Sequence, residues 1–137
     1  MDTTWIALLR GINVGKAKRI AMADLRALVA GLGFTHVRTL LNSGNVVFRG
    51  EAGSASEIAS QIERAIVAKS GFSSRVTVLS AAELDRIIVE DPLGAIADDP
   101  SRYLVAVLQD PVDIQLLQPL LIRDFSPERI VTGHRYV

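Results

Sequence analysis

The sequence predicts an α+β fold in two parts. A ferredoxin-like split βαβ unit (β-α-β-β-α-β) is expected at residues 1–79, followed by a shortened, incomplete β-α-β-β unit at residues 80–137. Apolar runs of strand length alternate with segments of helical periodicity, and Asn42-Ser43-Gly44 between two such runs is typical of a tight hairpin turn. The chain has 137 residues, of which 49% are hydrophobic, so it can bury a core although it contains no cysteine for disulfides.

The elements of the first unit follow from local patterns. Residues 5–9 form an apolar run that ends at Arg10-Gly11, as a buried strand does. Apolar residues then recur at helical spacing over 22–32, and residues 37–41 and 45–49 are predicted to form the two strands of the hairpin. These four segments provide the first β-α-β-β of the unit.

A second helix and a fourth strand complete that unit. Isoleucines four residues apart over 58–66 predict an amphipathic helix that ends near Gly71, and residues 75–79 predict the strand. Ser80 and Glu83 have the spacing of a capping box, which predicts that a further helix begins there. The first unit is therefore expected to be complete at residue 79.

The second unit is expected to be shorter. Residues 90–101 are polar with two prolines, as a linker is, and residues 103–108 predict a buried strand. A helix over 114–121 is expected to be kinked or ended by Pro119, and residues 130–137 are expected to form a last hairpin. The exposed strand edges of such an incomplete unit predict a homodimer formed through residues 103–137.

Charge is distributed unevenly along this neutral chain. Residues 1–50 hold seven basic and two acidic side chains, whereas residues 51–137 hold eight basic and thirteen acidic ones. Such asymmetry is typical of a basic face for an anionic partner, and it is also expected where one half of a protein neutralises the other. Both interpretations remain open from the sequence.

The basic residues are expected to gather at one end of the first unit. In the split βαβ order, the end of the first strand, the start of the first helix and the hairpin turn, including Asn42, lie at the same end of the sheet. Glycines, cations and backbone N–H groups at a helix start are suited to binding an anion, although the glycines and asparagines could simply shape the turns. The predicted anion-binding residues are Arg10, Asn13, Gly15, Lys16, Lys18, Arg19, Ser43 and Asn45.

Other chemistries find less support. The segment from Gly11 to Ala17 is one residue short of a P-loop and lacks its hydroxyl, and no Ser/His/Asp arrangement suggests catalytic residues. The acidic residues around Glu90 and Asp98 are typical of an exposed linker, so no metal site and no cofactor are predicted. The favoured function is a non-catalytic binding module for an anionic small molecule or nucleic-acid phosphate. The alternatives are an enzyme with an anionic substrate and an unidentified base, or a structural or oligomerisation domain.

Three segments resemble the DUF1697 family of bacterial proteins of unknown function. They are Trp5–Gly15, which matches the family's "LLRGINVGG" opening, residues 22–32, and Ser43–Phe48, which matches its "QSGNVVF" hairpin. The resemblance implies an α+β protein with two ferredoxin-like halves and no agreed chemistry. Family members usually continue past the position of Val137 with a segment that contains "RNWNT", and this chain is expected to lack that segment.

The hydropathy pattern predicts a cytoplasmic protein without a membrane partner. The first residues lack the basic region of a signal peptide, and Arg10 interrupts the apolar run that follows. The longest unbroken apolar run, Tyr103–Leu108, is far shorter than the roughly 20 residues of a membrane span.

Overall fold

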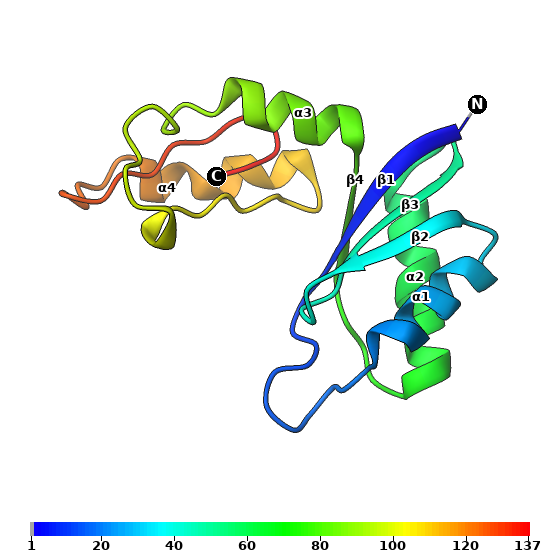
Figure 1. Cartoon of the computed structure of the whole chain (residues 1–137). Coiled ribbons are helices and arrows are strands. Elements are labelled where there is room, and N and C mark those ends of the chain that lie inside the picture. The colour runs from blue at the N-terminus through cyan, green and yellow to red at the C-terminus, as the bar shows by residue number, and fades with distance from the viewer. Residues whose placement is uncertain (1) are drawn as a thin grey trace. The chain divides into compact units, whose positions relative to one another are not determined.

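The computed structural model describes residues 2–137 and confirms an α+β protein with a four-stranded antiparallel sheet. The described chain divides into two units, one that extends to Glu83 and one from Leu84 to Val137. Figure 1 shows the elements of each unit.

The sheet belongs to the first unit. Its strands are β1 (Asp2–Leu9), β2 (Thr35–Leu40), β3 (Asn45–Glu51) and β4 (Val76–Ser80), and they lie in the order β2-β3-β1-β4. β3 pairs antiparallel with both β1 and β2, so β1 and β2 run parallel with β3 between them. The end of β1 and the start of β3 therefore lie at the same end of the sheet.

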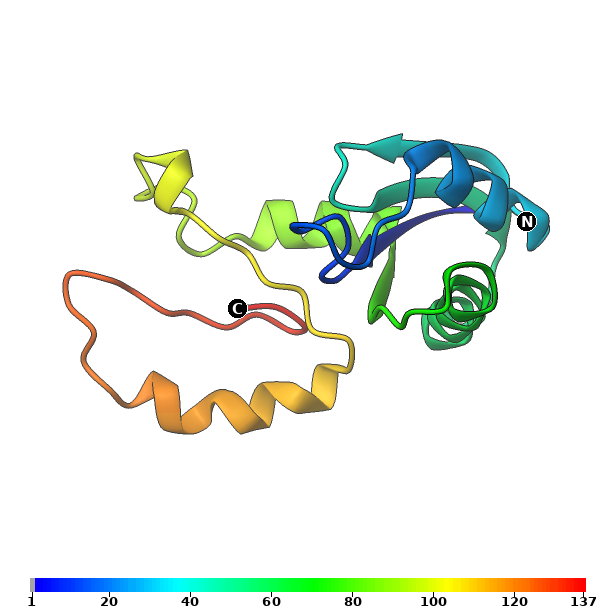
Figure 2. The same ribbon diagram turned by 90° about the horizontal axis from the view of Figure 1, so that it is seen from below.

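Helices α1 (Met22–Gly31) and α2 (Ala55–Ser70) cover one face of this sheet, as Figure 2 shows. Alternate residues of the strands point to that face, since successive side chains of a strand point to opposite sides. The buried cluster includes Phe48 of β3, Leu25 of α1 and Ile62 of α2, all of which are fully buried. Burial of these side chains against the strands holds α1 and α2 to the sheet.

The capping residues expected from the sequence are in place. α2 ends at Gly71, which adopts a φ of 75°, a conformation that glycine accepts without steric cost. α3 (Ala81–Glu90) begins with the predicted capping box: the Glu83 N–H donates to Ser80 Oγ at 3.1 Å, and the Ser80 N–H donates to Glu83 Oε1 at 3.5 Å. All seven elements predicted over residues 5–90 are present, with boundaries that differ by a few residues.

The β-α-β-β prediction for the second unit is wrong. Within residues 84–137 no strand forms, and the segments at 103–108 and 130–137 make one isolated bridge, between Val107 and Tyr136. Backbone hydrogen bonds between Ala106 and Val137 and between Leu108 and Arg135 flank this bridge, so the end of the chain pairs with 106–108 and not with 130–131. An apolar run signals a tendency to be buried, but a strand also needs a neighbour along its whole length.

The expected helix over 114–121 also differs. A 3-10 helix, η2 (Pro111–Leu117), is followed by a single α-helical turn, α4 (Gln118–Leu121). Pro119 lies in the first turn of α4, where a missing N–H costs nothing, so it begins this turn and does not end a longer helix.

The second unit buries few apolar side chains. Ile87 and Tyr136 are buried, whereas Leu104, Leu116 and Ile122 are largely exposed. None of the helices in the described part of the chain has both the length and the apolar character needed to span a membrane.

Candidate functional site

The loop after β1 and the turn between β2 and β3 lie against each other at one end of the sheet (Figure 1). The Leu9 N–H donates to the Gly44 carbonyl at 3.0 Å, and Asn13 Nδ2 donates to the Asn42 carbonyl at 2.8 Å. We call this region the basic end and define it as residues 10–20, 41–45 and 73–75. The geometry brings together the segments that carry the predicted anion-binding residues.

Asn13 shapes the loop. Its amide donates to the Ile20 carbonyl at 2.9 Å as well as to Asn42, and its Oδ1 accepts from the Ile20 N–H at 2.9 Å. Its backbone N–H donates to the Lys18 carbonyl at 2.9 Å and closes the loop. Since an asparagine amide has two hydrogens, both are already donated within the protein. Asn13 therefore positions the loop and has no N–H left for a ligand.

Asn45 acts in the same way on the turn. Its Nδ2 donates to the Leu40 carbonyl at 2.9 Å and to Ser43 Oγ at 3.1 Å. Both asparagines that the sequence suggested as ligand contacts thus hold the two segments in shape. Any charge that recognises an anion at this end comes from the basic side chains.

The basic side chains of the loop are exposed. Arg10, Lys16, Lys18 and Arg19 all lie at the surface, and Arg19 donates to the Asn13 carbonyl at 3.2 Å. Among the described residues, none of these four side chains forms an ion pair. Gly15, with a φ of 63°, allows the loop to turn between Asn13 and Lys16.

Arg75 is a further basic residue of this end that the sequence reasoning missed. Leu9 pairs with Val76 across β1 and β4, so Arg10 lies opposite Arg75, and the Arg10 N–H donates to the Arg75 carbonyl at 2.9 Å. Leu9 and Val76 are buried in the core, whereas Arg10 and Arg75 are exposed, and Arg75 lies beside Glu63 and Arg64 of α2 in a shallow pocket. The first and last strands of a split βαβ sheet are neighbours, and this topology was the signal that could have identified Arg75.

Two like charges opposite each other on neighbouring strands repel. Within the described chain, no carboxylate lies within 4.0 Å of either guanidinium to offset this. Ser74 Oγ donates to the Arg10 carbonyl at 2.8 Å and helps to fix the Arg10 backbone beside Arg75. The first turn of α1 follows the loop and has no side-chain cap at Ala21, and the Asp24 carboxylate in this turn offsets the positive potential of its N–H groups.

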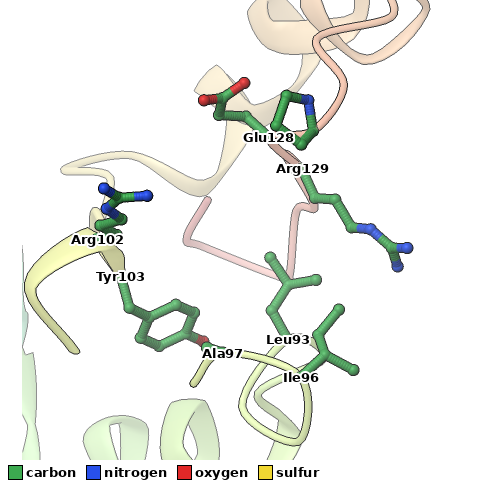
Figure 3. Close-up of a pocket in the computed structure, with 8 residues that line it drawn as sticks. Leu93, Ile96, Ala97, Arg102, Tyr103, Glu128 and Arg129 are labelled. Atoms are coloured by element: carbon green, nitrogen blue, oxygen red, sulfur yellow. The ribbon is translucent and has the colours of Figure 1, made fainter. Parts of the chain in front are cut away.

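A pocket lies elsewhere, in the second unit. It has a volume of about 480 Å³, and Figure 3 shows Leu93, Ile96 and the Tyr103 ring along it, with Arg102 and Arg129 at its margins. The sequence suggested only a linker here and gave no signal of a pocket.

Asp91 holds this linker in a defined shape. Its Oδ1 accepts hydrogen bonds from the Tyr103 hydroxyl and from the N–H groups of Leu93 and Gly94. The bond from Tyr103 lowers the pKa of the Asp91 carboxyl, and the same bond raises the pKa of Tyr103 to about 12. These hydrogen bonds give Asp91 a structural role in the segment that forms the pocket.

Comparison with solved structures finds a similar fold. The conserved bacterial protein SP0830 from Streptococcus pneumoniae aligns with a TM-score of 0.73 and 24% sequence identity over 88% of this chain. The chain spans 66% of the length of that protein. No curated protein matches the sequence. A family model, described as "Protein of unknown function (DUF1697)", matches residues 2–137, and the chain therefore belongs to the DUF1697 family.

Proposed function

We propose that the protein is a non-catalytic binding module that holds an anionic small molecule or a nucleic-acid phosphate at the basic end. The opposition of Arg10, directly after β1, and Arg75, directly before β4, carries this proposal. An oxyanion between them would accept hydrogen bonds from both guanidiniums and would replace their repulsion by attraction. Lys16, Lys18 and Arg19 would add a positive field that salt screens over about 8–10 Å.

The proposal includes a ferredoxin-like arrangement for the first unit. Its support is the β-α-β-β-α-β order of the elements together with the β2-β3-β1-β4 order of the antiparallel sheet. In this arrangement Arg10 and Arg75 are the first residues beyond the end of β1 and before the start of β4, and the sheet holds the backbone of both strands. Residues anchored directly to strands keep their geometry better than residues in the middle of loops.

Phosphate or sulfate is expected to raise the melting temperature of the protein at low ionic strength. Arg10→Ala should abolish this rise, and Arg75→Ala should reduce it strongly, since a charge-assisted hydrogen bond is worth roughly 1.5–3 kcal/mol. Lys18→Ala should weaken it only slightly, because an exposed lysine acts mainly through the field. Thermal melts across a phosphate series at constant ionic strength measure these effects.

Arg49→Ala is the matched control for this experiment. Arg49 is exposed and pairs with Thr4 at the other end of the sheet, so this variant removes one positive charge without touching the basic end. It should keep the full response to phosphate. An unchanged response in a folded Arg10→Ala variant would show that Arg10 is structural, and the absence of any response in the wild type would contradict the anion site.

We also propose that the chain forms a homodimer through residues 103–137. The side chains of Leu104, Leu116 and Ile122 are largely exposed there, and burial of apolar side chains favours association. Sedimentation equilibrium is expected to show a dimer at micromolar concentrations and a shift towards monomer in Leu104→Asp. A wild-type protein that stays monomeric at several hundred micromolar would contradict this proposal.

A further inference from the structure

The basic end and the adjoining end of β2 also present apolar side chains to solvent. Val14 and Leu41 of the basic end are 73% and 74% exposed, and Leu40, the last residue of β2, is 65% exposed. Val14 follows Asn13 and Leu41 precedes Asn42, and these two polar residues are joined by the 2.8 Å hydrogen bond from Asn13 Nδ2. The loop that carries Val14 and the turn that carries Leu41 are therefore neighbours, although 27 positions separate these two residues in the sequence.

The conformation of Leu41 is unusual for its side chain. It adopts a φ of 62°, in the left-handed region that a bulky residue without a polar group seldom occupies. Such strain persists only where the surroundings impose it, and it is concentrated at functional positions. An asparagine or glycine would fit this backbone better, so an exposed leucine here gains nothing for the turn itself.

Residues next to Val14 and Leu41 are packed in the core. Ile12 and Ile20, which flank the loop, are buried in the core, while Val14 between them is exposed. Gly44 of the turn packs so closely on Ile12 and Leu9 that a Cβ would lie 2.7 Å from Ile12 Cδ1. Val14 and Leu41 are therefore exposed next to residues that are packed in the core.

We propose that this end docks on the surface of a bilayer rich in anionic phospholipid, with Val14, Leu40 and Leu41 entering the boundary between headgroups and acyl chains. This inference rests on the proposed function, because the lipid phosphates would be the anions that Arg10 and Arg75 bind. Residues 10–20 and 41–45 contain no carboxylate, so no negative charge in them opposes the approach to such a surface. Exposed apolar residues among cations are what peripheral membrane association requires.

Nucleic acid fits the same surface less well. Sequence-tolerant binding to single strands depends on aromatic side chains that stack on the bases, and residues 10–20 and 41–45 contain no aromatic residue. Aliphatic tips gain nothing from a phosphate backbone but are stabilised among lipid acyl chains. The hydropathy pattern that argues against a membrane span does not bear on this mode of attachment, which needs only a few exposed side chains.

Vesicle co-sedimentation of the full chain tests the inference. We expect binding to phosphatidylcholine vesicles that contain phosphatidylglycerol and none to phosphatidylcholine alone. Leu41→Asn combined with Val14→Ser should weaken vesicle binding about tenfold or more while leaving the effect of inorganic phosphate on the melting temperature unchanged. Asparagine accepts a positive φ, so the first of these substitutions should not destabilise the turn.

Val89→Ser is the matched control, since Val89 is 85% exposed on α3, outside the basic end, and its replacement should not change vesicle binding. Arg10→Ala should weaken both vesicle binding and the response to phosphate. A response to phosphate without vesicle binding would overturn the inference and leave the proposed function standing, whereas the absence of both would overturn both. Equal binding to both kinds of vesicle, or binding only to a single-stranded polynucleotide, would also overturn the inference.

Discussion

Gly44→Ala is expected to lower the free energy of unfolding by about 2–4 kcal/mol. Gly44 has a φ of 89°, which an alanine adopts only with strain. Its new Cβ would also lie 2.7 Å from Ile12 Cδ1 and 2.9 Å from Leu9 Cβ. The isoleucine tip can turn away, but Leu9 Cβ is fixed by the backbone of β1, so the turn itself must move.

Urea unfolding measures this loss, with an unchanged dependence on urea concentration as the sign that only stability has changed. Gly31→Ala is the control, because Gly31 ends α1 without a positive φ and a Cβ there meets nothing within 4 Å. It should leave stability unchanged or raise it by up to about 1 kcal/mol. If both variants lost the same stability, the close approach of the turn to Ile12 and Leu9 would not be the cause.

Asn13→Ala is expected to cost about 2–3 kcal/mol of unfolding free energy, from three hydrogen bonds worth about 1 kcal/mol each. The substitution removes the hydrogen-bond partner of the Ile20 N–H and of the carbonyls of Ile20 and Asn42. This substitution should also weaken the response to phosphate although it removes no charge, because the loop and the turn are no longer tied together. Parallel urea unfolding and phosphate melts measure both effects.

Asn13→Gly separates the loss of the hydrogen bonds from the backbone strain that an alanine adds at this position. Asn13 has a φ of 54°, which glycine adopts freely and alanine does not, so the glycine variant lacks the hydrogen bonds but avoids the strain. It should be more stable than Asn13→Ala and less stable than the wild type. An alanine variant as stable as the wild type would mean that the Asn13 network does not hold the loop.

The first unit was predictable because its signals are local. Helical spacing, the Asn42-Ser43-Gly44 turn and the Ser80–Glu83 capping box each act within a few residues, and the elements formed where these patterns lie. Strand order then brought the loop after β1 beside the turn before β3. The local pattern of residues 103–108 predicted a strand incorrectly, because this apolar run pairs with another segment only around Val107.

The roles of individual residues at the basic end depended on tertiary contacts. Asn13 and Asn45 were expected to orient a ligand, but their amide hydrogens are donated to neighbouring groups of the protein. Arg75, which the sequence left unnoticed, lies opposite Arg10 because β4 pairs with β1. A hydrogen-bonding side chain has the same identity whether its partner is the protein or a ligand, so the sequence alone does not distinguish the two.

The sequence by itself thus determined the strands and helices of residues 2–83, the glycine end of α2, the capping box of α3 and the meeting of the loop with the hairpin turn. Only the tertiary structure decided which polar groups are already satisfied, which arginines oppose each other, and that Val14 and Leu41 are exposed while Ile12 is buried. Backbone conformation depends mainly on residues that are close in the sequence. Burial and strand pairing depend on residues that are distant in the sequence and come into contact only when the chain folds.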